Sequence, residues 1–112
     1  MRRYADRVDR LRKDVLEGRG ETSPGLRQAA AARAAELGGG PATPREDIPE
    51  GLREYVDTVA LHAYRVTDED VGRLRRNGYS EDEIFEASIA TALGAALARL
   101  EAGLAALDGE ES

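Results

Sequence analysis

Residues 81–107 read EDEIFEASIATALGAALARLEAGLAAL, which is the longest uninterrupted helical pattern in the chain. Its large apolar side chains recur every three or four residues, so an α-helix would place them on one face. The other faces carry small residues, and no charge occurs between Glu86 and Arg99. A helix that is apolar all round is buried on more than one side. We therefore expect a helix about 40 Å long that packs on its own domain and, through residues 87–104, on further copies of the chain.

The segments before residue 81 carry four more helical patterns, which together predict an all-α fold of about five helices. Glycines and prolines separate the patterns, because neither residue continues a helix readily. The expected helices are residues 4–17, residues 24–37, a segment from Pro49 to about Arg65, a short segment from Thr67 to Asn77, and residues 81–107. The second of them is mostly alanine, which favours helix formation but provides little apolar surface to bury.

Three helices also have sequence signals for their first turn. Ser23 is followed by a proline, the preferred order of residues where a helix begins. Thr67 with Asp70, and Ser80 with Glu83, have the spacing of a capping box, in which each side chain binds the backbone N–H of the other residue. This pattern gives Asp70 a structural explanation, which stands beside its candidacy for proton transfer.

The distribution of glycine and proline divides the chain into four parts. Residues 1–40 would form an N-terminal helical pair or arm, packing loosely or on a neighbouring subunit. Residues 41–49 form a loop rich in proline, residues 50–107 form the helical core, and residues 108–112 are an acidic tail.

Composition excludes several classes of function. The 112 residues contain no cysteine, so disulfides, thiolate metal sites and thiol catalysis are excluded. The formal net charge of −6 disfavours nucleic acid as a partner. The first residues lack the apolar stretch of a secretory signal, and no apolar run reaches about 18 residues, so we expect a cytoplasmic protein without a membrane partner.

Residues 62–86 read HAYRVTDEDVGRLRRNGYSEDEIFE. This segment resembles the carboxymuconolactone decarboxylase / AhpD-like superfamily, a group of all-helical proteins that are commonly oligomers. Redox members carry Cys-x-x-Cys-x-x-x-His, a short helix, a glycine, and a helix that opens with acidic residues and isoleucine. The matching positions here are Leu74, Gly78, Ser80, Glu83 and Ile84. The resemblance covers about residues 50–107 and implies an AhpD-like helical bundle with a long C-terminal helix.

The same resemblance places the family's two cysteines at Ala63 and Val66 and its histidine at Asp70. Disulfide exchange requires a nucleophilic thiolate and a second thiol that resolves the mixed disulfide. Ala63 and Val66 can supply neither, so the resemblance implies a member without thiol peroxidase or disulfide reductase activity.

Four side chains are candidates for proton transfer: His62, Tyr64, Asp70 and Glu86. His62 lies on the predicted apolar face of its helix, where it is either a packed core histidine or a general base. Tyr64 is either a packing residue or an acid. Glu86 is either a solvated charge or an inward-facing carboxylate with a raised pKa.

Two hypotheses follow, one of a binding or structural protein and one of an enzyme. The first is a non-redox AhpD-like subunit of a homo-oligomer that binds a small molecule or a protein. The second is a cofactor-free enzyme of the carboxymuconolactone decarboxylase type that uses His62 and nearby carboxylates. The sequence predicts no metal or cofactor site, because a lone histidine is a poor ligand set and no phosphate-binding loop is present. If the chain contained a helix-turn-helix motif, its recognition helix would be the one that starts at residue 81. That helix begins with acidic residues at 81–83, which DNA phosphates would repel.

Overall fold

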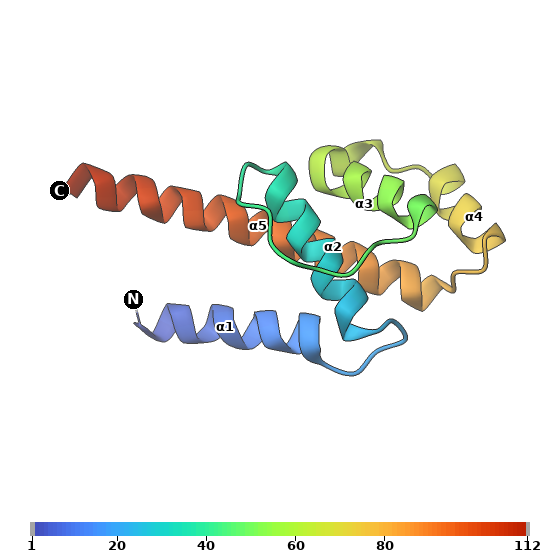
Figure 1. The fold of residues 1–112 in the computed structure, drawn as a ribbon, viewed down its shortest axis with the longest axis horizontal. Helices are drawn as coiled ribbons and strands as arrows, with labels where there is room; N and C mark the ends of the chain where they lie inside the picture. Colours follow the sequence, from blue (N-terminus) through green and yellow to red (C-terminus); the bar gives the residue numbers. More distant parts are fainter. Residues whose placement is uncertain (1, 112) are drawn as a thin grey trace.

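The computed structural model describes the backbone of residues 2–111 and the side chains of residues 5–108. Its elements are α1 (Arg2–Glu17), α2 (Pro24–Leu37), α3 (Glu50–His62), the 3₁₀ turn η1 (Ala63–Arg65), α4 (Asp68–Arg76) and α5 (Glu81–Glu111). No strand occurs within this part of the chain, so the all-α prediction is confirmed. Figure 1 shows the other helices arranged along α5, which defines the long axis of the molecule.

Local hydrogen bonds explain where three helices begin. The Ser23 hydroxyl accepts from the backbone N–H of Leu26 at 3.1 Å. The predicted capping boxes are both present. Thr67 and Asp70 exchange bonds of 3.0 and 3.2 Å, and Ser80 and Glu83 exchange bonds of 2.8 and 3.1 Å. These bonds satisfy N–H groups that have no partner inside the first turn of a helix.

The core is centred on the contact between α2 and α5, which is made largely of small residues. Ala29 and Ala30 on α2 and Ala90 on α5 are fully buried. A Cβ atom added to Gly94 would lie only 2.2 Å from the carbonyl oxygen of Ala31. The two backbones therefore approach each other so closely that no side chain fits between them. This packing places α2 in the core of the bundle.

The helices α3 and α4 complete the core at the N-terminal end of α5. Leu52 and Val56 on α3, Leu74 on α4 and Ile84 on α5 are all buried. The buried Tyr55 shares a hydrogen bond of 2.7 Å with Ser88 across the α3–α5 contact. This end of the molecule contains the larger apolar side chains that the alanine-rich end lacks.

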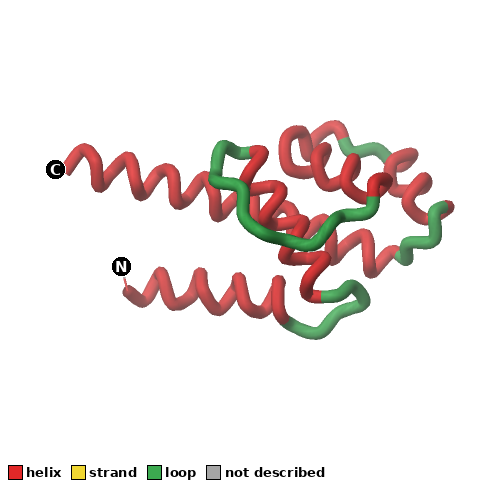
Figure 2. The backbone as a smooth tube through the Cα atoms, viewed as in Figure 1, coloured by secondary structure: helices red, strands yellow, loops and turns green. Residues whose placement is uncertain are grey.

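The loop of residues 38–49 returns the chain from the end of α2 to the start of α3, as Figure 2 shows. Ile48 anchors it in the core with 7% of its surface exposed, and Arg45 forms an ion pair with Glu36. The loop therefore lies along the helices.

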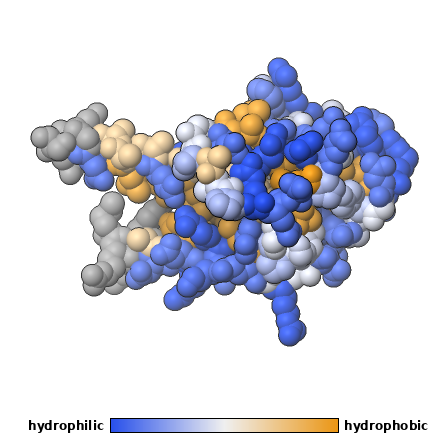
Figure 3. Space-filling view, in the orientation of Figure 1, coloured by the Kyte–Doolittle hydropathy of each residue, from blue (hydrophilic) through white to orange (hydrophobic). Residues whose placement is uncertain are grey.

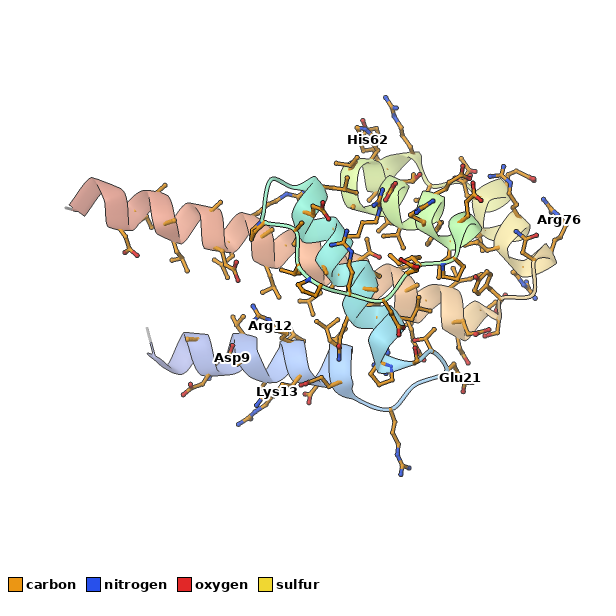
Figure 4. The ribbon with its side chains drawn as sticks, in the orientation of Figure 1. Asp9, Arg12, Lys13, Glu21, His62 and Arg76 are labelled. Atoms are coloured by element: carbon orange, nitrogen blue, oxygen red, sulfur yellow. The ribbon has the colours of Figure 1, made fainter. Side chains whose placement is uncertain are left out.

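α1 lies beside the C-terminal half of α5, and both chain ends are at the same end of the molecule (Figure 1). Leu16 of α1 is buried in the core, and Val15 packs against it. Further toward the N-terminus, Arg12 pairs with Glu101 on α5 at 3.3 Å. In Figure 4, Arg12 points toward α5 whereas Lys13 points away from it.

α5 extends beyond the rest of the bundle and continues to Glu111, past the predicted end at residue 107. The molecule therefore measures 52 × 27 × 24 Å. Residues Glu81–Asp108 are long and apolar enough to cross a membrane by length and composition, and only 22% of the most apolar 18-residue stretch is buried. Uninterrupted apolar runs do not reveal this segment, because Glu86, Arg99 and Glu101 interrupt it. Figure 3 shows apolar surface along the extended part of the helix.

Candidate functional site

Glu86 is at the centre of a polar cluster that joins α5 to the loop between α1 and α2. Its carboxylate accepts hydrogen bonds from the backbone N–H groups of Glu21 and Thr22, at 2.7 and 2.9 Å. The Thr22 hydroxyl donates a third bond at 2.6 Å. One side chain therefore fixes a loop that lies 64 residues earlier in the sequence.

The second member of the cluster is Arg27, a buried arginine with 4% of its surface exposed. Its guanidinium donates to the backbone carbonyls of Val15, at 2.6 Å, and of Gly18. Val15 is in the last turn of α1 and Gly18 directly follows that helix, so the guanidinium lies at its C-terminal end, where the helix dipole favours a positive charge. Arg27 Nε makes no hydrogen bond but lies 4.0 Å from a Glu86 oxygen. Arg27 on α2 thus holds α1 and compensates the charge of Glu86.

The environment of Glu86 determines its protonation state. Burial by itself would raise the pKa of this carboxyl. The bonds donated by Thr22 and Glu21, together with the charge of Arg27, outweigh burial and hold the pKa below its ordinary value. The expectation of a raised pKa for an inward-facing Glu86 is therefore wrong, because the carboxylate is surrounded by donors. It stays ionised at neutral pH and has no proton to donate.

His62 occupies the last position of α3 and is exposed. Figure 4 shows its side chain at the outer end of that helix. The prediction that it packs on the apolar face is wrong, since the chain leaves the helical path at His62 and the periodicity ends there. Its ring contacts Tyr64 edge-on at 5.9 Å between centroids. Tyr64 is itself 79% exposed, with the Arg65 guanidinium 5.7 Å from its ring centre.

The remaining candidates lie around the turn that links α3 to α4. Ala63 is exposed and Val66 is partly buried, and the backbone N–H of Val66 binds the carbonyl of Ala63 at 3.2 Å. The two positions assigned to the missing cysteines therefore bracket one 3₁₀ turn. Asp70 forms the capping box with Thr67 and lies 3.9 Å from Arg73.

The structure does not bring the four proton-transfer candidates together. Asp70 lines a cavity of about 230 Å³ between α3 and α4, with Glu54, Tyr55 and Arg73 among its other lining residues. Glu86 lines a different cavity, of about 180 Å³, between α1 and α5. No hydrogen bond or ion pair joins His62 to a carboxylate among the described side chains. Within the same residues, no group of three His, Asp or Glu side chains could hold a metal ion.

Sequence reasoning missed Thr22 and Arg27. Arg27 did leave a signal, because it is the only charged residue between Pro24 and Ala32, in a segment whose other residues are mostly small. A single arginine in such a segment is surrounded by buried positions. Thr22 left no comparable signal, since its partner Glu86 is distant in sequence.

No family model, curated protein or solved structure matches this chain. The geometry of its own residues is therefore the basis for assigning a function.

Proposed function

We propose that this chain is a non-redox, AhpD-like helical subunit of a homo-oligomer, and that it acts by binding or by structural support. The observation that carries the proposal is the exposure of α5. An apolar stretch of 18 residues that is only 22% buried in a single copy is unusual for a protein in water. Covering this helix with further copies of the chain would remove that surface from the solvent.

The chemistry of the candidate residues supports a binding role over an enzymatic one. His62 and Tyr64 lie in solvent, Asp70 forms a helix cap, and the Glu86 carboxylate is held ionised by its donors. Proton transfer needs an acid and a base within hydrogen-bond reach of one substrate. Of these groups only His62 and Tyr64 are in contact, whereas Asp70 and Glu86 line two other cavities. With no cysteine in the sequence, thiol chemistry has no nucleophile.

Light scattering coupled to size-exclusion chromatography tests the proposal directly. The unmodified chain at high micromolar concentration should have a mass that is at least twice 12.1 kDa. A mass of 12.1 kDa across the accessible concentration range would show that the chain is a monomer and would refute the proposal.

A further inference from the structure

The outward side of α5 carries a largely exposed apolar stripe, which borders α1 where Phe85 and Ile89 line the cavity between the two helices. We call it the outer stripe; its members are Phe85, Ile89, Ala92, Ala96, Leu100, Gly103 and Leu107. They are three or four residues apart and therefore follow one side of the helix. Phe85, Ile89 and Leu107 are 64%, 41% and 56% exposed, and the small members are exposed as well. Gly94, which faces α2, lies on the opposite side of the helix from this stripe.

The sizes of these side chains follow an order whose inner part is complementary to its own reverse. The stripe reads Phe, Ile, Ala, Ala, Leu, Gly, Leu, with Ala96 at the centre. If a second α5 runs in the opposite direction and Ala96 faces Ala96, then Ile89 faces Gly103 and Leu100 faces Ala92. A large side chain then meets a small one at the two positions on each side of the centre, and Phe85 faces Leu107 at each end. A two-fold symmetric interface needs this self-complementarity, because the same surface serves both subunits.

We infer that α5 pairs in antiparallel orientation with α5 of a second copy, centred on Ala96. This inference rests on the proposed function and specifies which surface forms the oligomer and how it is oriented. A parallel pair would place Phe85 against Phe85 and Ala96 against Ala96. Large residues would then meet at four positions instead of at the two ends alone, and gaps would remain at Ala92, Ala96 and Gly103, where the lost contacts are costly.

The charges of the two ends also favour the antiparallel orientation. Residues 1–19 carry seven basic and four acidic side chains, whereas residues 67–86 carry seven acidic and three basic ones. α1 lies beside the C-terminal half of its own α5, as the pair between Arg12 and Glu101 shows. Antiparallel pairing brings this basic helix near the acidic first turn of α5 in the second copy. Parallel pairing would instead place the two acidic first turns side by side.

The size of the stripe indicates how strong the contact is. From residue 85 to 107 the stripe is about 33 Å long and about 12 Å wide, or on the order of 400 Å² per copy. A standard interface buries about 800 Å² per partner. We therefore expect association in the micromolar range.

Charge reversal at the centre of the stripe tests the contact. Ala96→Glu places two like charges against each other, which costs several kcal/mol, and should weaken association more than 100-fold. Ala96→Lys should do the same, and an equal mixture of the two variants should associate again. Ala105→Glu is the matched control, because Ala105 is exposed on the opposite side of the same helix. The control should keep the mass of the unmodified chain, and helicity by circular dichroism verifies folding.

Disulfide cross-linking tests the orientation, and the cysteine-free chain makes each new thiol unique. Ile89→Cys and Gly103→Cys variants are mixed and oxidised with oxidised glutathione, so that two thiols give one S–S bond and the glutathione is reduced. Peptide mapping should find cross-links mainly between positions 89 and 103. Cross-links of 89 with 89 and of 103 with 103 would overturn the antiparallel orientation.

The possible failures are distinguishable. A chain of 12.1 kDa refutes the proposed function and this inference together. An oligomer whose mass is unaffected by Ala96→Glu refutes the outer stripe as the interface while the oligomeric function stands. A monomer that sediments with phosphatidylcholine vesicles would instead assign the stripe to a lipid surface.

Discussion

α1 and α2 both lie against α5, but different forces hold them there. α2 approaches through its backbone and small side chains, and it comes closest where the carbonyl of Ala31 meets Gly94. α1 is held at its C-terminal end by a polar cluster, in which Arg27 binds carbonyls of that helix and Glu86 binds the loop that follows.

The α2–α5 contact and the attachment of α1 should therefore respond to different kinds of substitution. A contact between backbones depends on volume, because added atoms have no space and the backbone cannot rotate away. A cluster of charged hydrogen bonds depends on the presence of every member, because a buried group that loses its partner pays its full desolvation cost. Volume changes should therefore affect the α2–α5 contact, whereas charge changes should affect the attachment of α1.

The largest effect is expected from Arg27→Met. This change leaves the carbonyls at the end of α1 without a donor and Glu86 without a nearby cation, and should lower the free energy of unfolding by about 3 kcal/mol. Urea denaturation measures the loss. Arg33→Met on the same helix is the control, since the pair of Arg33 with Asp57 is partly exposed and contributes about 1 kcal/mol or less. Equal losses in the two variants would contradict the special role of Arg27.

Gly94→Ala tests the contact between α2 and α5. The added Cβ meets backbone atoms of Ala31 at 2.2 to 2.7 Å, so the helices must separate. Overpacking outweighs the gain in helix propensity, and we expect a net loss of about 2 kcal/mol in stability. Thermal unfolding followed by circular dichroism provides the measurement. A variant as stable as the parent chain would show that the helices are not in such close contact.

Glu86→Gln tests the polar cluster through its pH dependence. The pKa of folded Glu86 lies below its ordinary value of 4.5, so its contribution is present above pH 4.5 and is lost as the pH falls through the folded pKa. We expect the variant to be about 1 kcal/mol less stable at pH 7. The difference between the two proteins should shrink as the pH falls below 4.5. A difference that stays constant with pH would contradict a stabilising charge at this position.

Gly72→Ala should give the smallest change in stability, and unlike the other substitutions it should stabilise the protein. A Cβ at this position in α4 meets only the flexible end of Arg76, at 3.3 Å. Alanine should therefore raise the free energy of unfolding by about 0.7 kcal/mol, through helix propensity alone. The contrast with Gly94 separates the effect of close contact from that of glycine itself. A loss of stability in chemical denaturation would contradict this assignment.

The parts of the fold that depend on neighbouring residues could be predicted from the sequence. Ser23 and the two capping boxes start their helices through bonds that span three residues. Gly78 adopts a φ of 102°, which follows from its place after Asn77 at the end of α4. The all-α class followed from the sum of such local signals, because each one is encoded within a single turn.

The candidate site could not be predicted in the same way, because its contacts join distant segments. Glu86 and Thr22 are 64 residues apart, and no local pattern pairs them. His62 was misplaced because periodicity cannot show where a helix ends without a glycine or proline, and α3 ends at that residue. The end of α5 was placed too early because residues after 107 contain no apolar anchor, although the helix continues through them.

The alanine-rich contact of α2 with α5 also has a consequence for how stability varies with temperature. The heat capacity of unfolding grows with the apolar surface that is exposed, at about 12–15 cal/mol/K per residue in ordinary domains. Buried alanines such as Ala29, Ala30 and Ala90 expose little of it. The heat capacity of unfolding per residue should therefore be lower for this chain than that average. A small heat capacity of unfolding flattens the curve of the free energy of unfolding against temperature. This fold would therefore lose its stability gradually on both cooling and heating.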